Sequence, residues 1–492
     1  MTNLSGTNLN NGTAVGPQGE GMDSPSTFPK YPAYKDSGVE WLGDVPEHWE
    51  VGSLRRLIKS VGNGTTADQV DEAEDTVAVS RIETISAGLI NFEKVGHVGP
   101  QDVARRFLLN AGDILFSHIN SLSMVGNVAI YSGGRPLLHG MNLLRIQPLP
   151  SISSEWLLYW LKSKNVRQEV ESRAKPAINQ ASISTDSVRA LPALIPPSFE
   201  QTQIARFLDH ETAHIDALIE EQQRLIELLK EKRQAVISHA VTKGLDPTVP
   251  MKDSGVEWLG EVPAHWQVGA LKHFISPVPG AIKTGPFGSH LKSEDMKEGP
   301  YKVFNQRSVI DADFSAGDNF ISEEKFAELR GFTAFPGDVL VTTRGTIGRA
   351  AILPDNAEVG ILHPCLLRVQ VDESKITSSY LCRLIQESHL LKTQLSLMSN
   401  STTIEVIYSE TMANLLIPVP PITEQAQIAA FLDDVISKFG ALTSDANESV
   451  RLLQERRSAL ISAAVTGKID VRGWQPPAST QAPKLEEVAE AV

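Results

Sequence analysis

The chain has 492 residues and a mass of 53.6 kDa, more than one hydrophobic core usually supports, which predicts several domains. With 41% hydrophobic and 21% charged residues it is typical of a soluble globular protein, and no run of 18 apolar residues predicts a transmembrane helix. A formal net charge of −14 gives no support for general binding to nucleic acid, although one basic face on an acidic protein would suffice.

The two ends of the chain have the composition of tails. Residues 1–34 are rich in Gly, Asn and Ser near their start and lack the charged and then apolar pattern of a signal peptide. We expect residues 1–34 and 471–492 to be disordered. The only cysteines, Cys365 and Cys382, are too few for a disulfide framework or a cysteine-ligated zinc site. A cytoplasmic protein without a membrane partner is therefore expected.

One stretch organises the sequence: KDSGVEWLGDVPEH at 35–48 returns at 252–265 as KDSGVEWLGEVPAH. A match of this length indicates a tandem duplication. His48 and His265 recur within it and could be catalytic. We instead interpret them as histidines stacked on the neighbouring tryptophans, because no second titratable residue repeats nearby in the sequence.

Each copy is followed by a variable block, at about 51–197 and 268–420, with short β-type runs separated by turn residues. The strands expected in the first block are TVAVSRIET, GLINFEKV, GDILFSHI, GNVAIYS and NLLRIQP, and those in the second are KVFNQ, GDVLVTT, GRAAIL and LLRVQV. A helix is predicted after the strands in each block, over 154–173 and near 377–397.

Only two short runs align between the blocks: GDILF at 112–116 with GDVLV at 337–341, and LLRI at 143–146 with LLRV at 366–369. The loops differ throughout. A shared scaffold with unshared loops is what two recognition modules with different targets require.

Each block ends in a proline-rich run, followed by EQTQIARFLD at 200–209 or EQAQIAAFLD at 424–433. Apolar residues then recur with a seven-residue pattern, which predicts two long helices forming a coiled coil. A helix over about 202–242 would span roughly 60 Å, longer than one turn of B-DNA. The predicted seam consists of Ile204, Leu208, Ile215, Leu218, Leu225, Leu229, Val236, Ile428, Leu432, Val435, Leu442, Leu453 and Leu460.

These motifs together resemble the specificity subunit of type I restriction–modification enzymes. The resemblance rests on SGVEWLG(D/E)VPxHW, GD(I/V)L, TGPFGSHLK at 284–292, PPxxEQxxIAxFLD and ISxAVT, in this order and mostly in duplicate. It implies a mixed α+β fold, internally duplicated, with two target-recognition domains separated by two long antiparallel coiled-coil helices. The expected boundaries are a tail at 1–34, recognition domain 1 at 35–199, spacer helix 1 at 200–246, recognition domain 2 at 247–422, spacer helix 2 at 423–470 and a tail at 471–492.

The same resemblance implies the function. Each recognition domain would read one half of an asymmetric bipartite site in double-stranded DNA, while the helices set the gap and dock two methyltransferase subunits. Restriction (motor) subunits would join this complex. The chain itself would be non-catalytic and bind no cofactor, with S-adenosylmethionine, ATP and Mg bound by the partner subunits.

The sequence motifs agree with a non-catalytic chain. It contains no G-x-x-x-x-G-K-[ST] phosphate loop, no N/D/S-P-P-Y/F methyltransferase motif and no HExxH or Cys/His metal spacing. A bivalent coiled-coil scaffold that never touches DNA is the alternative, because both variable blocks are close to neutral in charge. An enzyme in its own right is a third, disfavoured hypothesis.

Residues that read bases need paired donors and acceptors on loops between strands. In the second block the segments 283–292 and 342–346 have this character, and in the first block 117–123, 63–66 and Arg81 do. The candidate DNA-binding residues are Asn63, Thr65, Thr66, Arg81, Ser117, His118, Asn120, Ser121, Lys283, Thr284, Gly288, Ser289, Lys292, Thr342, Thr343, Arg344 and Thr346. No catalytic residue and no metal ligand is expected.

Overall fold

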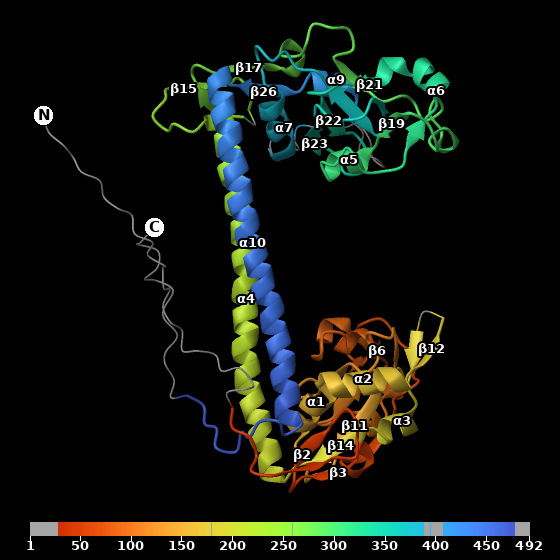
Figure 1. The fold of residues 1–492 in the computed structure, drawn as a ribbon. Helices are drawn as coiled ribbons and strands as arrows, with labels where there is room; N and C mark the ends of the chain where they lie inside the picture. The colour runs from red at the N-terminus through yellow and green to blue at the C-terminus, as the bar shows by residue number, and fades with distance from the viewer. Residues whose placement is uncertain (1–27, 179, 258, 388–393, 395–406, 478–492) are drawn as a thin grey trace, which may run out of the picture. The chain divides into compact units, whose positions relative to one another are not determined.

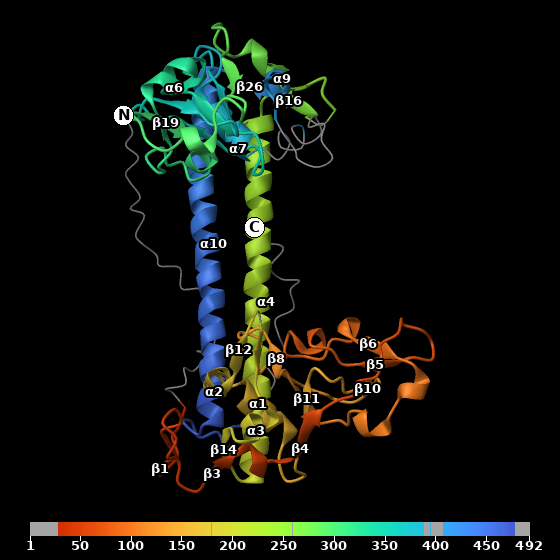
Figure 2. The same cartoon turned by 90° about the vertical axis from the view of Figure 1, so that its right-hand side faces the viewer.

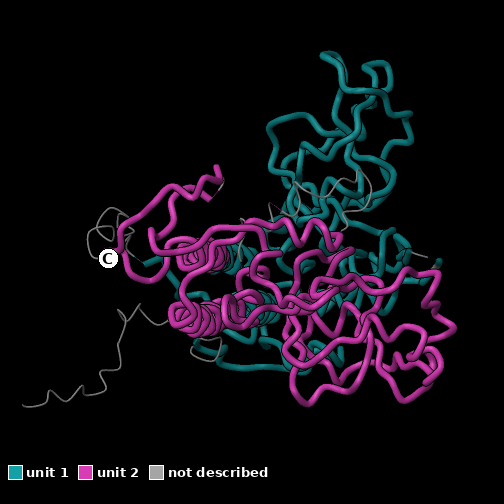
Figure 3. Tube along the Cα trace, turned by 90° about the horizontal axis from the view of Figure 1, so that it is seen from above, with its two compact units in different colours: residues 1–221, 449–492 teal, residues 222–448 magenta. Residues whose placement is uncertain are grey.

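The computed structural model describes residues 28–178, 180–257, 259–387, 394 and 407–477. The chain forms two compact units (Figure 3): unit 1 contains residues 1–221 and 449–492, and unit 2 contains residues 222–448. Two long helices, α4 (Ser198–Lys243) and α10 (Ile422–Val465), each contribute one half to each unit. In the described part of the chain, no helix is long and apolar enough to cross a membrane.

The main sheet of unit 1 is antiparallel, with strand order β4 (Ile58–Asn63), β11 (Leu144–Pro148), β7 (Ile114–Phe116) and β9 (Val128–Ile130). Successive side chains of a strand point to opposite faces. Ile114 and Phe116 therefore enter the core beneath helix α1 (Ser154–Lys162), whereas Leu115 enters a second core on the other face. Burial on both faces explains why GDILF is apolar without alternation.

The second core of unit 1 lies under a smaller sheet of β10 (Leu137–Leu138), β5 (Val77–Val79) and β6 (Gly96–Val98). Figure 2 shows these strands on the side of the main sheet that faces away from α1. Two further ribbons have two strands each: β1 (Tyr34–Asp36) with β2 (Asp44–Pro46), and β3 (Glu50–Ser53) with β14 (Pro192–Ile195). A three-stranded sheet consists of β8 (Ile119–Asn120), β13 (Gln180–Ser182) and β12 (Lys175–Ala177). The other α-helices of the recognition domain are α2 (Lys164–Arg173) and α3 (Thr185–Arg189).

Unit 2 repeats this plan (Figure 1). Its main sheet has the order β18 (Ile282–Thr284), β25 (Leu366–Val369), β22 (Val339–Thr342) and β23 (Ala350–Ile352), and Val339 and Leu340 again enter different cores. Two ribbons pair β15 (Met251–Asp253) with β16 (Glu261–Pro263) and β17 (Gln267–Ala270) with β26 (Leu416–Val419). The smaller sheet has the order β20 (Phe320–Ile321), β19 (Tyr301–Phe304), β24 (Gly360–Leu362) and β21 (Thr333–Ala334). The α-helices are α5 (Gln306–Ile310), α6 (Glu323–Glu328), α7 (Ser378–Glu387) and α9 (Ser409–Ala413).

The predicted fold class is confirmed: the protein is mixed α+β, internally duplicated and built around two long helices. Two local predictions were wrong. GLINFEKV forms a 3-10 helix over Phe92–Lys94 instead of a strand, since Leu89 is 69% exposed and no neighbouring strand pairs with this segment among the described residues. The helix predicted over 154–173 is broken at Ser163, whose extended backbone separates α1 from α2. The later part of the helix predicted near 377–397 lies outside the described residues.

The halves of α4 and α10 pack against each other within each unit. They are antiparallel, because the start of α4 and the end of α10 lie together in unit 1, where Asp216 and Arg457 form an ion pair. Most predicted seam residues are buried or half-buried there. Leu225 and Leu442 are corrections, because they are 42% and 52% exposed. Ile226 and Ala446 are buried in their place, as a helix with 3.6 residues per turn drifts away from a strict seven-residue repeat.

The core of unit 1 extends further toward both ends of the chain than predicted. Tyr31 and Val471, assigned to disordered tails, are 4% and 1% exposed. Asp470 N donates to Pro29 O at 2.7 Å, and Trp474 packs edge-on against Phe207 of α4. Apolar and aromatic side chains in both segments thus extend the core of unit 1.

Candidate nucleic-acid interface

The start of the first repeat is held by one buried carboxylate, Glu200, in the first turn of α4. Its Oε2 accepts hydrogen bonds from Trp49 Nε1 at 2.8 Å and Tyr31 Oη at 2.9 Å, and its Oε1 lies 2.7 Å from His48 Nε2. A carboxylate only accepts, so His48 presents Nε2–H. Burial and the Glu200 carboxylate together hold the pKa of Tyr31 above its ordinary value.

The same arrangement holds the second repeat. Glu424 of α10 accepts from Trp266 Nε1 at 3.1 Å and lies 2.8 Å from His265 Nε2. Each repeated histidine therefore does have a repeated titratable partner, which corrects the sequence interpretation. That partner lies more than 150 residues away along the chain, in the EQxxIAxFLD motif. The arrangement is structural, because the three groups satisfy one another and no described metal-binding cluster lies there.

The glutamine that follows each of these glutamates fixes the recognition domain to the long helix. Gln201 accepts from Ser153 N at 2.9 Å, just before α1, and donates to Pro196 O at 2.8 Å. Gln425 accepts from Thr377 N and donates to Pro420 O, both at 2.8 Å. The duplicated EQ motif is thus the joint between the recognition domain and helix within each unit.

In each unit, a buried ion pair joins the two short runs that align between the variable blocks. Asp113 of GDILF pairs with Arg145 of LLRI, both less than 10% exposed, and Asp338 pairs with Arg368 at 4.0 Å in the second unit. Each aspartate also caps its preceding turn, since its Oδ2 accepts from the backbone N–H three residues earlier. These pairs fix the strands from whose ends the candidate loops emerge.

In unit 1, the structure brings together four of the predicted residues, in two hydrogen-bonded pairs. Asn63 at the end of β4 lies 3.1 Å from His118 Nε2 and also donates to Met141 O at 3.0 Å, while Asn120 Nδ2 donates to Ser117 Oγ. Burial lowers the pKa of His118, so it is neutral and accepts from the Asn63 amide. Arg81 does not join them and lies beside Gln69 and Gly96 of the smaller sheet.

In unit 2, the predicted loop lies beside a hollow of about 500 Å³ lined by Gln306, Arg307, Thr346 and His363, among others. Gln306 Nε2 donates to Arg344 O at 2.7 Å and thereby fixes the loop backbone, while the Arg344 side chain is exposed. Burial and nearby Arg344 lower the pKa of His363, so it adds no charge at neutral pH.

A family model described as the type I restriction modification DNA specificity domain matches residues 46–229 and 288–451. The chain belongs to this family. A putative type I restriction enzyme MjaX specificity subunit from Methanocaldococcus jannaschii is 30% identical over 445 residues, covering 88% of this chain and 96% of the relative. The MjaVIII specificity subunit from the same organism is 24% identical over 437 residues, covering 87% and 94%.

Solved structures share the fold of this specificity subunit. A chain from a structural study of complex assembly and conformational transition in a type I R-M system aligns with a TM-score of 0.65 and 16% identity, covering 86% of this chain and 98% of that chain. The HsdS subunit from Thermoanaerobacter tengcongensis aligns with a TM-score of 0.52, also at 16% identity and with the same coverage. The prediction of a type I specificity subunit is confirmed.

Several candidate residues of the specificity subunit are not free to contact DNA. Thr342 and Thr343 are 0% exposed, Ser117 is 1%, His118 is 7% and Thr65 is 8%, so the expectation that their side chains contact bases was wrong. These residues lie at the ends of buried strands or at the starts of loops. The sequence TTRGT at 342–346 does not indicate which of its residues is the first exposed one. Lys283 lies 4.5 Å over the Phe332 ring and the Thr284 hydroxyl bonds to Ser409. The candidates left exposed are Asn63, Thr66, Arg81, Ser121, Gly288, Ser289, Lys292, Arg344 and Thr346.

Two groups of polar residues at the surface of this specificity subunit were not predicted from its sequence. Gln306 and Arg307 begin α5 next to the predicted loop, although they lie almost 40 residues earlier in the chain. The β12–β13 hairpin pairs with β8 and so presents Lys175 and Gln180 beside the loop of Asn120. The polar residues Lys175 and Gln180 were a signal that could have been used, whereas no sequence pattern marks Gln306.

Glycine is required where the first strand of each main sheet ends. A Cβ on Gly64 would lie 2.0 Å from His139 O, and one on Gly285 would lie 2.2 Å from His363 O. We expect Gly64→Ala and Gly285→Ala to destabilise their units by about 1–3 kcal/mol, because backbone must move. Gly288→Ala, with nothing within 4 Å, is the control and should change stability by less than about 0.5 kcal/mol. Thermal unfolding measures all three, and equal stabilities would contradict the expected clash.

His139 gives unit 1 an acid-sensitive stability. It is 2% exposed, its Nε2 donates to Leu143 O at 2.9 Å, and burial lowers its pKa to about 4. In the unfolded chain this histidine has a pKa near 6.5, so it binds a proton as the pH falls below that value. The folded chain does not bind this proton until the pH is lower, which favours the unfolded state. Stability should therefore decrease by about 3 kcal/mol between about pH 6.5 and pH 4. Unfolding midpoints across this range should depend less on pH in His139→Gln, and an unchanged slope would contradict this assignment.

Proposed function

We propose that this specificity subunit reads an asymmetric bipartite sequence in double-stranded DNA, one half with each unit. One observation carries the proposal. The two units share the sheet, the buried Asp–Arg pair and the Glu–His–Trp clamp, whereas the loops at the strand ends differ in length, sequence and surroundings. A common scaffold with unlike loops recognises two unlike half-sites.

The chemistry of the exposed loop residues suits base reading. Arg344 can bind guanine O6 and N7 with two hydrogen bonds, and Gln306 can bind adenine N6 and N7 in the same manner. Asn63 uses both of its N–H donors on His118 and Met141, so it offers its Oδ1 as an acceptor. Gln306 already uses one N–H donor to bind the backbone of the Arg344 loop, so the two residues would contact neighbouring bases together.

The long helices offer a docking surface for methyltransferase subunits. Leu225 and Leu228 of α4 are 42% and 51% exposed at a spacing of three residues, which places them on one side of the helix, and Leu442 of α10 is 52% exposed. Exposed leucines in a row suit a partner helix with an apolar stripe. The helices would also fix the unread gap between the half-sites.

The chain would be non-catalytic on its own. Its glutamates and histidines with repeated positions are engaged in the structural clamps, and the described residues contain no group of three or more His, Cys, Asp or Glu side chains placed to bind a metal. In this proposal the methyltransferase subunits bind S-adenosylmethionine, and the restriction subunits bind ATP and Mg.

Modified-base sequencing of host DNA, with the gene intact and deleted, tests the proposal. Loss of adenine methylation at one split, asymmetric motif upon deletion supports it. Exchange of residues 51–197 for the block of another subunit should then alter one half of that motif only. A motif that is unchanged by this exchange would contradict the proposed reading, and a complex with methyltransferase that shows no salt-sensitive retention on duplex DNA would favour a protein scaffold.

A further inference from the structure

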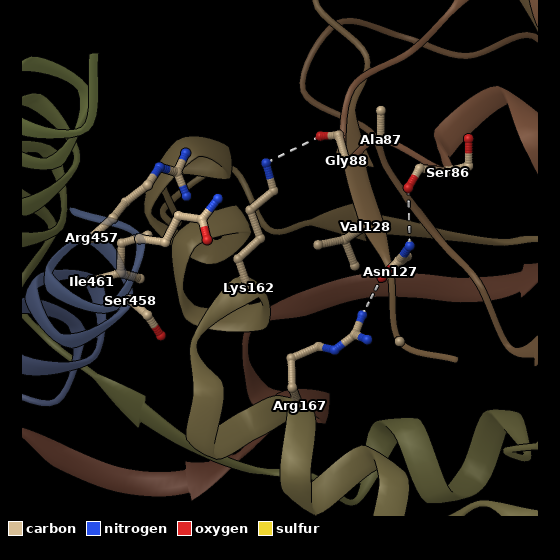
Figure 4. A pocket seen from close by; sticks show the side chains of 12 residues that line it. Ser86, Ala87, Gly88, Asn127, Val128, Lys162, Arg167, Arg457, Ser458 and Ile461 are labelled. Carbon is tan, nitrogen blue, oxygen red and sulfur yellow. Dashed lines mark hydrogen bonds between the residues drawn. The ribbon is translucent and has the colours of Figure 1, made fainter. Parts of the chain in front are cut away.

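A cleft of about 510 Å³ lies in unit 1 where the recognition domain meets α10 (Figure 4). Loops around Gly88 and Asn127 form one wall, and the α10 segment 454–461 forms the other. Lys162, Arg167 and Arg457 line the cleft, whereas no carboxylate is among the described lining residues. In a chain of formal net charge −14, this is a local excess of positive charge.

Lys162, the last residue of α1, projects into this cleft from below (Figure 4). Its ammonium donates one hydrogen bond, to Gly88 O at 3.1 Å, so two donors remain. Burial, together with the neighbouring Arg457, lowers its pKa. No carboxylate forms an ion pair with it in the described part of the chain, and the charge of Asp216 offsets the lowering of its pKa only in part. A bound anion would therefore relieve the free-energy cost of this half-buried charge.

Arg457 reaches the cleft from α10. Its Nε and Nη2 donate to Asp216 Oδ1 and Oδ2 at 2.7 and 3.1 Å, which fixes the guanidinium and leaves its Nη1 donors for another partner. Arg167 differs, because it bonds Asn127 Oδ1 and Ser123 O and so supports the wall of the cleft. Lys162 and Arg457 are therefore the two cations with donors to offer.

The second repeat shows that the scaffold does not need this charge. With the offset of 224 residues that aligns the two EQ motifs, Gln386 takes the place of Lys162 and Arg233 takes the place of Arg457. Arg233 Nη2 donates to Glu387 Oε2 at 2.7 Å, so the arginine at this place is paired with a carboxylate in both units. Among the described residues, the two units therefore differ in Lys162, which is the cation that a ligand of the unit 1 cleft would neutralise.

We propose that the cleft binds a phosphate group of the DNA backbone through Lys162 and Arg457. This rests on the proposed function, that the subunit binds duplex DNA. Phosphate contacts set the register of a protein on DNA without reading sequence. Because one cation belongs to the recognition domain and the other to α10, a phosphate held between them would lock the domain to its helix upon DNA binding.

The test is the salt dependence of DNA binding by the complex with its methyltransferase partner. Loss of one phosphate contact reduces the slope of log Kobs against log salt concentration by about 0.9. We expect this reduction for Lys162→Gln, which installs the residue of the second repeat, and weaker binding to all DNA sequences equally. Lys162→Arg should keep the slope, and so should Lys164→Gln, a matched charge loss at an exposed lysine. The methylated motif should be the same in every variant.

A wild-type slope in Lys162→Gln would overturn the proposal, as would an equal loss in Lys164→Gln. Calorimetric titration of the DNA-free complex with inorganic phosphate separates the two sources of a phosphate group. Phosphate binding that depends on Lys162, with an unchanged DNA slope, would assign the cleft to free phosphate and overturn the DNA assignment. A wild-type complex that shows no salt-sensitive DNA binding at all would instead overturn the underlying proposed function.

Discussion

Replacement of Glu200 by alanine is expected to destabilise unit 1 by about 3–5 kcal/mol, the range for breaking a buried charged pair. The carboxylate is 1% exposed and is the partner of three groups, Trp49 Nε1, Tyr31 Oη and His48 Nε2. Its removal leaves two almost fully buried donors without an acceptor, and each unsatisfied group costs about 1–3 kcal/mol. Calorimetry should show the unfolding transition of unit 1 lowered by about 10 °C.

The second repeat supplies the matched control for Glu200. Glu424 has two partners instead of three, and its side chain is 22% exposed, so water can replace part of what Glu424→Ala removes. We expect a loss of about 1–2 kcal/mol there. An equal or larger loss in Glu424→Ala than in Glu200→Ala would contradict the role assigned to burial.

Replacement of Leu225 and Leu228 by glutamate is expected to abolish methylation while leaving the subunit folded. Both leucines are exposed, so charges at these positions should cost the fold of the isolated chain little. In a complex, burying each leucine would contribute about 1.5–3 kcal/mol, and two charges in an apolar interface oppose it further. Binding to the methyltransferase should weaken by about 100-fold or more, measured by co-purification and by methylation of host DNA.

The control for these leucines adds the same charges to the same helix. Gln223→Glu combined with Ala235→Glu places two glutamates at exposed positions of α4 without removing a leucine. This variant should assemble and methylate as the wild type does. Normal assembly of the leucine variant, or failure of both variants, would show that the methyltransferase does not use this leucine patch.

The architecture could be predicted from the sequence because its strongest patterns are long repeats and long stretches with helical periodicity. Both structural clamps are built from repeated motifs. Each joins a histidine at the end of a repeated segment, 35–48 or 252–265, to the glutamate of an EQxxIAxFLD motif, Glu200 or Glu424. Their pairing in space was not predicted, because the glutamate lies about 150 residues from its histidine and tryptophan. Repetition of both motifs at nearly equal offsets was the available sign that they belong together.

The candidate site was harder to predict for a physical reason. A threonine after a buried strand looks like a loop residue in the sequence, but burial continues through Thr342 and Thr343 and ends at Arg344. Gln306 comes to the Arg344 loop only through the packing of α5 on β22, which no local pattern records. Loops could thus be found from the sequence, whereas the exposed members of each loop depend on tertiary packing.

The variable segment of each unit starts and ends in one two-stranded ribbon. Glu50 pairs with Ile195 and Val51 with Leu194 in β3 and β14, and Gln267 pairs with Val419 in β17 and β26. The intervening 140 or so residues therefore enter and leave the fold at a single place, next to the repeated clamp. In genetic terms each variable block is a cassette with fixed borders. On the proposed function, recombination between genes at those borders would transfer the recognition of one half-site in one event and leave the pairing of the ribbon intact.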